Sequence, residues 1–348
     1  MGLVEPLTAL RRIAFLLERR LEPTYRVKAF RRAAEVVLEQ GDALQQRADQ
    51  ATLDDLPGIG KVTATVIAEA LAGQVPQYLV KLERETSGEL VELDESATAI
   101  RQALRGDLHT HSDWSDGGSP IEEMAMTAIE LGTEYQALTD HSPRLTVARG
   151  LTAQRLRKQL DVLAGLSGRL GSFRLLSGIE VDILEDGALD QAPELLSRLD
   201  VVVASVHSKL AMDSPAMTRR MLAAIGDRHT NILGHCTGRL IGAKKRGQSS
   251  FDPVAVFEAC ARNNVAVEIN SRPERLDPPT ELLRLAVQAG CLFSIDTDAH
   301  APGQLDWKPY GCRLAAECEV PVERIINSWP VEQLLDWIQS SRAARAGR

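Results

Sequence analysis

The sequence lacks a long apolar run. No stretch of its 348 residues approaches the roughly 20 consecutive apolar residues that a membrane-spanning helix needs, although 44% of the residues are hydrophobic and 25% are charged. The N-terminus also lacks the charged segment followed by an apolar segment that marks a secretory signal. Together these absences predict a cytoplasmic protein that makes no membrane contact.

The sequence also lacks paired cysteines and an excess of positive charge. Its cysteines are odd in number and scattered without the spacing of metal ligands, so they predict neither a disulfide framework nor a cysteine-ligated metal. The net charge of -8 excludes a generally basic surface, so any DNA contact must rest on local patches or on backbone amides. The five cysteines are Cys236, Cys260, Cys291, Cys312 and Cys318.

The length predicts one large domain and one small domain. Residues 1–92 are predicted to be all helical, because apolar residues recur at helical spacing over 7–17 and 27–38, and Gly41 is a natural stop. The run 53–61, Leu-Asp-Asp-Leu-Pro-Gly-Ile-Gly-Lys, then predicts a tight turn between two short helices. This is the pattern of a helix-hairpin-helix.

Such a hairpin predicts DNA binding without sequence readout. Its glycines let backbone amides point at a phosphate from the N-terminus of a helix. A nearby cationic stretch has no acid between Glu22 and Glu35 in the sequence and forms a second candidate patch. The alternatives are a simple turn between packed helices and a solvated helix face. The candidate DNA contacts are Gly58, Gly60, Lys61, Arg26, Lys28, Arg31 and Arg32.

Residues 93–105 are predicted to form a linker, and 106–348 a second domain of alternating strands and helices. Strands that alternate with helices predict a parallel sheet with right-handed crossovers, and in a closed barrel the site lies at the carboxyl ends of the strands. The predicted strands are the segment before His109 and the segments 136–140, 174–182, 200–206, 231–234, 265–270 and 292–296.

Side chains that bind metals recur at the ends of these predicted strands. His109 and His111 are two positions apart at the end of the first strand, so their side chains lie on the same face. Asp116 follows in a Ser-Asp-Gly turn. Imidazole nitrogens and a carboxylate suit Zn, Mn or Fe. His229 precedes its strand and is interpreted as structural. The other candidates, at later strand ends, are His141, Glu180, His207, His235, Asp298 and His300, so the pattern predicts a polynuclear metal site.

These residues resemble the PHP (polymerase and histidinol phosphatase) family of metal-dependent phosphoesterases. The resemblance covers 106 to about 340 and is similar in detail to bacterial family X DNA polymerases, while residues 1 to about 90 resemble their N-terminal 8 kDa helical domain. It implies a distorted seven-stranded (β/α)7 TIM-like barrel behind a small all-α domain. It also implies that the nine candidate ligands bind two or three divalent ions, Zn, Mn or Fe.

The chain departs from those polymerases in three ways. Only about 15 residues separate the two modules, so no palm with paired catalytic aspartates fits between them. Val66 stands where the resemblance implies the lyase lysine, and valine cannot form a Schiff base. Cys236 follows His235, where related sequences have proline. We therefore expect neither polymerase nor lyase activity, and interpret Cys236 as a packed thiol that proximity to a metal could sensitise to oxidation.

The leading hypothesis is a metal-dependent phosphoesterase that processes DNA ends, as a 3'-5' exonuclease, a 3'-phosphoesterase or an endonuclease at abasic sites. Arg239 and Lys209, in loops after predicted strands, could bind the substrate phosphate, or could be ordinary loop charges. The alternatives are a small-molecule phosphatase, such as a histidinol phosphatase, and a non-catalytic DNA-binding module. The oligomeric state is open, and a monomer is compatible with the sequence.

Overall fold

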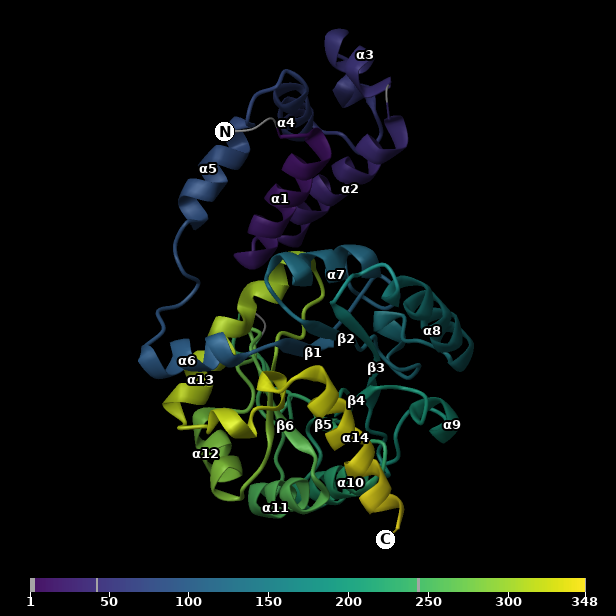
Figure 1. Cartoon of the computed structure of the whole chain (residues 1–348), viewed down its shortest axis with the longest axis vertical. Helices are drawn as coiled ribbons and strands as arrows, with labels where there is room; N and C mark the ends of the chain where they lie inside the picture. Colours follow the sequence, from purple (N-terminus) through teal and green to yellow (C-terminus); the bar gives the residue numbers. More distant parts are fainter. Residues whose placement is uncertain (1–3, 42, 243–244, 348) are drawn as a thin grey trace. The chain divides into compact units, whose positions relative to one another are not determined.

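The computed structural model describes residues 4–41, 43–242 and 245–347, and the chain divides into two compact units, 1–90 and 91–348. Each unit has its own hydrophobic core. Figure 1 shows the helices and strands of the chain. Within the described ranges, no helix is long and apolar enough to cross a membrane.

The first unit is helical. Every third or fourth residue of α1 is apolar and fully buried, as Leu10, Ile13 and Leu17 are, so one face of this helix forms the core against α2, α4 and α5. The helices of this unit are α1 (Pro6–Arg19), α2 (Thr24–Gln40), α3 (Ala43–Asp49), α4 (Lys61–Leu71) and α5 (Gln77–Thr86), with a short 3-10 turn η1 (Leu53–Asp55).

The predicted hairpin is formed by η1, a glycine turn and α4. Gly58 adopts φ +99°, and a Cβ at this position would lie 2.8 Å from the Arg32 Cγ, so only glycine fits without strain. Gly60 caps α4: its amide donates to the Thr63 Oγ1 at 2.9 Å. The turn therefore has the tight backbone that the sequence predicts.

The stretch that was expected to be a linker is mostly a helix of the second unit. Helix α6 (Glu95–Ala103) begins after Asp94, whose carboxylate accepts from the Ala97 amide at 2.7 Å. Ala97 and Ile100 are buried, and α6 packs against α13 (Lys308–Glu317). An N-cap and a short apolar face thus add this segment to the barrel unit.

The second unit is a seven-stranded parallel barrel, which confirms the predicted fold class. Each strand pairs with the next strand in the sequence, in the order β1 to β7. The strands are β1 (Gly106–Thr110), β2 (Tyr135–Leu138), β3 (Arg174–Asp182), β4 (Val201–Ser205), β5 (Ile232–Leu233), β6 (Ala266–Asn270) and β7 (Phe293–Asp296).

The seam between β1 and β7 is closed mainly by side chains. Asp296 accepts from the Leu108 amide at 2.7 Å, and Asp107 accepts from the Thr297 hydroxyl at 2.7 Å. Beyond the strand ends, the His111 amide donates to the Ala299 carbonyl at 2.8 Å. The first and last strands therefore meet without the continuous backbone ladder that joins the other pairs.

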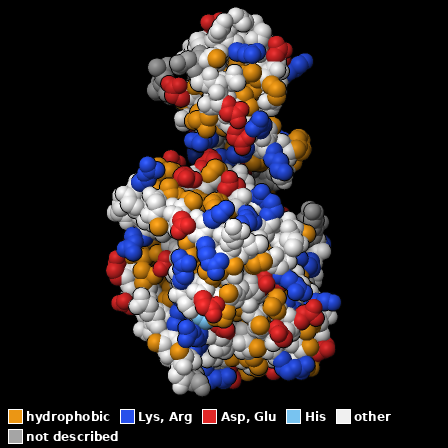
Figure 2. Space-filling model, turned by 90° about the vertical axis from the view of Figure 1, so that its right-hand side faces the viewer, with side chains coloured by type: hydrophobic (Ala, Val, Ile, Leu, Met, Phe, Trp, Pro, Cys, Tyr) orange, Lys and Arg blue, Asp and Glu red, His pale blue; other side chains and the backbone are white. Residues whose placement is uncertain are grey.

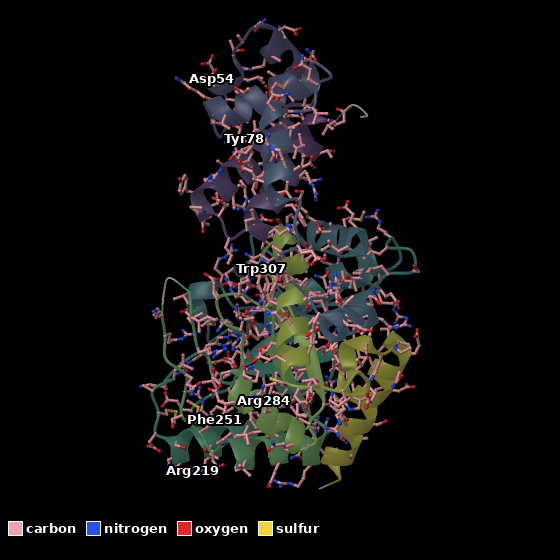
Figure 3. All side chains as sticks on the ribbon, turned by 90° about the vertical axis from the view of Figure 1, so that its left-hand side faces the viewer. Asp54, Tyr78, Arg219, Phe251, Arg284 and Trp307 are labelled. Atoms are coloured by element: carbon pink, nitrogen blue, oxygen red, sulfur yellow. The ribbon has the colours of Figure 1, made fainter. Side chains whose placement is uncertain are left out.

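Helices lie outside the strands, and apolar side chains between the two layers form the core (Figure 1). Trp307 and Phe257 are among the largest fully buried side chains; Trp307 is labelled in Figure 3. The remaining helices are α7 (Ile121–Glu130), α8 (Ala153–Ser167), α9 (Pro193–Leu196), α10 (Ser214–Gly226), α11 (Pro253–Asn263), α12 (Thr280–Gln288) and α14 (Val331–Ala346), with 3-10 turns η2 (Thr146–Ala148), η3 (Pro302–Trp307), η4 (Val322–Arg324) and η5 (Ile326–Ser328).

Candidate metal centre

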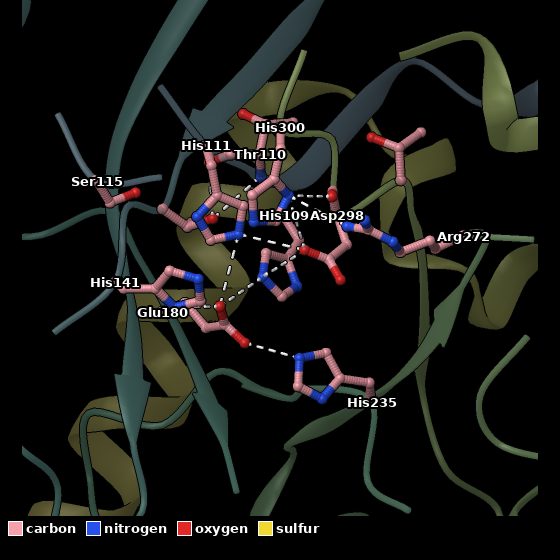
Figure 4. A network of polar contacts seen from close by, with 12 residues as sticks. His109, Thr110, His111, Ser115, His141, Glu180, His235, Arg272, Asp298 and His300 are labelled. Atoms are coloured by element: carbon pink, nitrogen blue, oxygen red, sulfur yellow. Dashed lines mark hydrogen bonds and ion pairs between the residues drawn. The ribbon is translucent and has the colours of Figure 1, made fainter. Parts of the chain in front are cut away.

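The nine predicted ligands meet at one end of the barrel, and Figure 4 labels all of them except Asp116 and His207. All lie in or just after strands β1, β2, β3, β4, β5 and β7, because parallel strands bring their carboxyl ends to the same edge. Eight are largely buried, and Asp116, in the turn after β1, has 38% of its side chain exposed. Adjacent imidazole rings have centroids 4.1 to 6.0 Å apart.

Glu180 lies at the middle of the cluster. One of its oxygens is 2.8 Å from the His235 Nε2 and 3.1 Å from the His207 Nε2. The other is 2.8 Å from the His141 Nδ1 and 3.2 Å from the His109 Nε2. Burial alone would raise the pKa of Glu180, but His207, His109 and His141 outweigh it and hold the pKa well below its usual range.

Two aspartates, Asp298 and Asp116, contact the imidazoles on the other side of the cluster. Asp298 Oδ1 is 3.3 Å from the His111 Nε2 and 3.6 Å from the His300 Nδ1. Asp116 Oδ1 is 3.3 Å from the His300 Nε2 and 3.5 Å from the His141 Nε2. These contacts connect Asp116 and Asp298 through the rings to Glu180, so the nine side chains form one continuous network.

The imidazoles of this network differ in electrostatic environment. Burial and the neighbouring His300 and His141 lower the pKa of His111 to about 3. Burial also opposes the charged form of His207, but Glu180 and Asp182 outweigh it and raise its pKa to about 9. Glu180 and Glu268 likewise outweigh burial and raise the pKa of His109 well above its usual value. Metal binding must therefore displace protons from some of these rings.

Many polar atoms of the cluster are buried and form no well-directed hydrogen bond, although several lie within ion-pair distance of one another. A buried polar atom left unpaired costs about 1–3 kcal/mol, so such atoms are rare unless a ligand binds them. Here they gather in one place, and their chemistry, imidazole nitrogen and carboxylate oxygen, suits divalent transition metals. The atoms are His109 Nε2, His111 Nδ1 and Nε2, His141 Nδ1, Glu180 Oε2, His207 Nδ1 and Nε2, and His235 Nδ1.

Three overlapping groups have their ligand atoms within 4.8 Å of one another. They overlap at His111, His141 and Glu180, so one residue of each pair of groups could bridge neighbouring ions. His235 and Asp298 lie outside these groups and contact Glu180 and His111. The groups are His111, Asp116, His141 and His300; His109, His111 and Glu180; and His141, Glu180 and His207.

Several functional residues at this site escaped the sequence reasoning. Glu268 contacts the His109 Nδ1 at 2.6 Å, and Asp182 accepts from the His207 amide at 3.0 Å. The Arg275 Nε lies 3.2 Å from the Asp298 Oδ2, and the Arg272 Nη1 lies 3.4 Å from the His300 Nδ1. All four are one or two residues from a strand end or in the loop after β6, which is the one signal that could have found them.

The two predicted phosphate-binding residues are placed differently from each other. Arg239 donates from its Nε to the Arg275 carbonyl at 2.9 Å and from its Nη2 to the Leu276 carbonyl, so its guanidinium braces the loop after β6. Lys209 is exposed in the loop directly after His207. On the face drawn in Figure 2, Lys and Arg side chains are interspersed with acidic ones over the barrel unit.

Two further side chains agree with their structural interpretation. His229 hydrogen-bonds through its Nδ1 to Asp227 at 2.9 Å and through its Nε2 to the Ser197 Oγ at 3.0 Å. Cys236 is buried, and burial together with Asp277 raises the pKa of its thiol well above the usual range. The thiol therefore stays protonated and of low reactivity despite its place beside His235.

In the helical unit, the predicted cationic patch is largely neutralised. Arg31 forms a two-pronged pair with Glu18 of α1, at 2.8 and 2.7 Å, and its side chain is only 12% exposed. This is a correction: an acid from the neighbouring helix, which sequence spacing could not reveal, removes Arg31 from the surface.

The other members of the patch also have partners or face solvent. Arg26 pairs with Glu22 and donates to the Tyr78 hydroxyl at 2.7 Å (Tyr78 is labelled in Figure 3), and Arg32 pairs with Glu35 at 2.8 Å. Lys28 and Lys61 are exposed. Of the predicted DNA-contacting cations, Lys61, beside the glycine turn, and Lys28 are therefore the exposed ones outside these ion pairs.

Comparison with known proteins finds one family model in each part of the chain. Residues 4–75 match the helix-hairpin-helix domain HHH_8, and residues 107–272 match the PHP domain. The DNA polymerase/3'-5' exonuclease PolX of Bacillus subtilis is 39% identical over 246 residues, 70% of this chain and 43% of that protein. The chain thus spans less than half of PolX.

More distant relatives are phosphatases by name. A protein of Serratia proteamaculans named "Probable phosphatase" is 28% identical over 243 residues, 67% of this chain and 93% of that one. The crystal structure of histidinol phosphate phosphatase from Lactococcus lactis, in complex with Zn, L-histidinol and phosphate, is 15% identical, with a TM-score of 0.39 over 70% of this chain and 94% of that chain.

Proposed function

The chain joins a helix-hairpin-helix domain to a PHP domain, and from this pairing we propose that it is a metal-dependent phosphoester hydrolase that processes DNA ends. The observation that carries the proposal is the cluster of nine metal-binding side chains with unpaired buried nitrogens. The name of the PolX relative, which includes a 3'-5' exonuclease, supports DNA as the substrate.

The nine clustered side chains would hold two or three ions of Zn, Mn or Fe. Bound divalent ions supply Lewis-acid chemistry, which polarises a phosphoryl group and eases deprotonation of an attacking water. The three overlapping ligand groups support more than one ion. Nine ligands also argue against a purely structural site, because structural zinc is normally closed by four.

Two arginines of the loop after β6 are proposed to bind the substrate phosphate. Arg275 pairs with the Asp298 Oδ2 through its Nε, while its Nη1 is buried with no hydrogen-bond partner. Arg272 lies beside His300 (Figure 4). Its guanidinium carbon is 5.8 Å from the centre of the Trp307 ring. A guanidinium matches phosphate oxygens in a two-pronged geometry, so these side chains orient the substrate.

The role first predicted for Arg239 becomes indirect. Its hydrogen bonds to the Arg275 and Leu276 carbonyls fix the backbone from which Arg275 reaches Asp298. Lys209, which is exposed after His207, keeps its proposed role as a cation that binds the substrate phosphate.

The helical unit is proposed to hold the DNA backbone. The Gly58 turn leads into α4, whose first residue is the exposed Lys61, so backbone amides and one ammonium group are available to a phosphate. Val66 is buried in α4 and cannot act as a nucleophilic amine, so this unit binds without lyase chemistry.

A small-molecule phosphatase is the alternative, and the phosphatase names of the distant relatives favour it. The decisive experiment incubates metal-loaded protein with end-labelled single-stranded, nicked and abasic DNA beside a panel of phosphomonoesters that includes histidinol phosphate. We expect the DNA substrates to be cleaved with the higher kcat/KM. Turnover of a phosphomonoester with no DNA cleavage would reject the proposal in favour of the phosphatase.

A further inference from the structure

Glu268 lies beneath the candidate metal centre and belongs to none of its ligand groups. It is fully buried on β6, between the strands that carry other metal-binding residues. One carboxylate oxygen contacts the His109 Nδ1 at 2.6 Å, and the other accepts from the His235 backbone amide at 2.5 Å. A single side chain thus touches two predicted ligands that come from two different strands.

The first contact determines which nitrogen of His109 is available. A neutral imidazole carries its proton on one nitrogen and a lone pair on the other. With the Glu268 carboxylate accepting from Nδ1–H, the lone pair is on Nε2, which lies 3.2 Å from the Glu180 Oε2 and has no hydrogen-bond partner of its own. The nitrogen that faces the cluster is therefore the one that can bind an ion.

The second contact fixes a poorly supported strand end. Strand β5 has only two residues, so few backbone hydrogen bonds hold His235, which follows it. Glu268 accepts from the amide of His235, while the ring of His235 contacts Glu180 at 2.8 Å. Without the carboxylate, this amide would be buried and unpaired.

We propose that Glu268 is a positioning residue of the metal centre, which fixes the Nδ1–H tautomer of His109 and the backbone of His235. The role depends on the proposed function only in requiring that the cluster binds ions; it does not depend on the substrate. Groups that orient metal-binding histidines in this way typically contribute about 10- to 100-fold to metal affinity.

The variant Glu268→Gln tests this role with little change in volume. A carboxylate has two acceptor oxygens, whereas an amide has one oxygen and one NH2 group. The amide cannot accept from both the His109 ring and the His235 amide, so one of the two contacts must be lost. The matched control is Asp277→Asn, because Asp277 is equally buried and accepts from Thr237 rather than from a predicted ligand.

The measurement is zinc affinity of the full chain, by competition with a chromophoric chelator. We expect Glu268→Gln to bind zinc about 10- to 100-fold more weakly than the wild type, and Asp277→Asn to stay within about threefold. Equal affinity of Glu268→Gln and wild type would overturn the proposal, as would an equal loss in both variants. DNA cleavage is assayed separately, so zinc binding without cleavage would reject the DNA function and leave this role intact.

A second measurement needs no variant of Glu268. In zinc-loaded wild-type protein labelled with 15N-histidine, long-range 1H–15N spectra report which ring nitrogen carries a proton. We expect the proton of His109 on Nδ1, with the signal assigned by its loss in His109→Gln. A proton on Nε2, or none on Nδ1, would overturn the assignment even if Glu268→Gln fails to fold.

Discussion

At the scale of single residues, the site is a balance of like and unlike charges around Glu180. Five imidazoles contact its carboxylate, and burial removes most of the water that would otherwise screen them. The metal-free centre must then be stabilised by protons on some of the rings. Metal ions that replace those protons would supply the positive charge that the buried carboxylates need.

Replacing both His109 and His111 with alanine is expected to abolish hydrolysis and to reduce the metal content to at most one ion. These side chains supply unpaired nitrogens to the cluster, while Leu108, the residue before His109, packs into the separate core of the barrel. Elemental analysis measures the ions, and circular dichroism measures the fold. A variant that keeps two or three ions and its activity would contradict the assignment of these ligands.

The raised pKa of His207, about 9, predicts how the metal-free protein responds to alkali. Because the folded-state pKa lies above the unfolded value of about 6.5, this contribution to stability is fully present below pH 6.5 and is lost as the pH rises through 9. The chelator-treated protein should therefore melt at a lower temperature at pH 9.5 than at pH 6.5. His109, whose pKa is also raised, acts in the same direction.

The control for this experiment is His207→Gln, which removes one titrating group. Its melting temperature should change less between the same two pH values. A variant whose alkaline shift equals that of the wild type would show that another group is responsible.

At the scale of elements, the proposed DNA-binding surface of the hairpin depends on the backbone conformation of one glycine. We expect Gly58→Ala to destabilise the helical unit by about 1 kcal/mol or more, because alanine disfavours φ +99° and its Cβ would meet Arg32. DNA affinity should fall with it. Thermal melting and fluorescence anisotropy with a labelled duplex measure the two effects.

Gly60→Ala is the matched control two residues away. Gly60 has φ -103° and open space around the position of a Cβ, so alanine fits there. Equal losses in the two variants would mean that the turn conformation is not what matters.

Elements were more predictable from sequence than contacts between elements. Apolar periodicity predicted the helices, and alternating strands predicted the parallel barrel, because each strand pairs with its sequence neighbour. The clustering of the nine predicted ligands could be foreseen because parallel strands end at one edge. In contrast, Arg31 with Glu18 and His109 with Glu268 are pairings across elements, set by packing geometry that no local pattern encodes. Helix α6 was missed because its apolar face is short.

At the scale of the whole molecule, the two units are proposed to divide binding from chemistry. Deleting residues 1–90 should reduce DNA cleavage by about tenfold or more, equivalent to about 1.4 kcal/mol of lost interaction, and leave phosphomonoester hydrolysis unchanged. Affinity of the full chain for DNA should weaken steeply with salt and be indifferent to base composition, because amides and ammonium groups contact only phosphates.

The salt series is also the control for this truncation. If the barrel alone cleaves DNA as well as the whole chain at every ionic strength, the helical unit does not contribute to DNA binding. The small-molecule phosphatase would then become the leading function.

Because the candidate metal centre spans the seam between β1 and β7, ions bound there would cross-link the two ends of the barrel sheet. Leu108 and Asp296, which meet there, are 188 residues apart in the chain. Holding them together restricts the conformations of the long segment between them and so lowers its conformational entropy. His111 and Asp298 contact each other across the same seam, at 3.3 Å. Ions shared by these two side chains would tie the first strand to the last, and would do in a chain with five free cysteines what a disulfide does in secreted proteins.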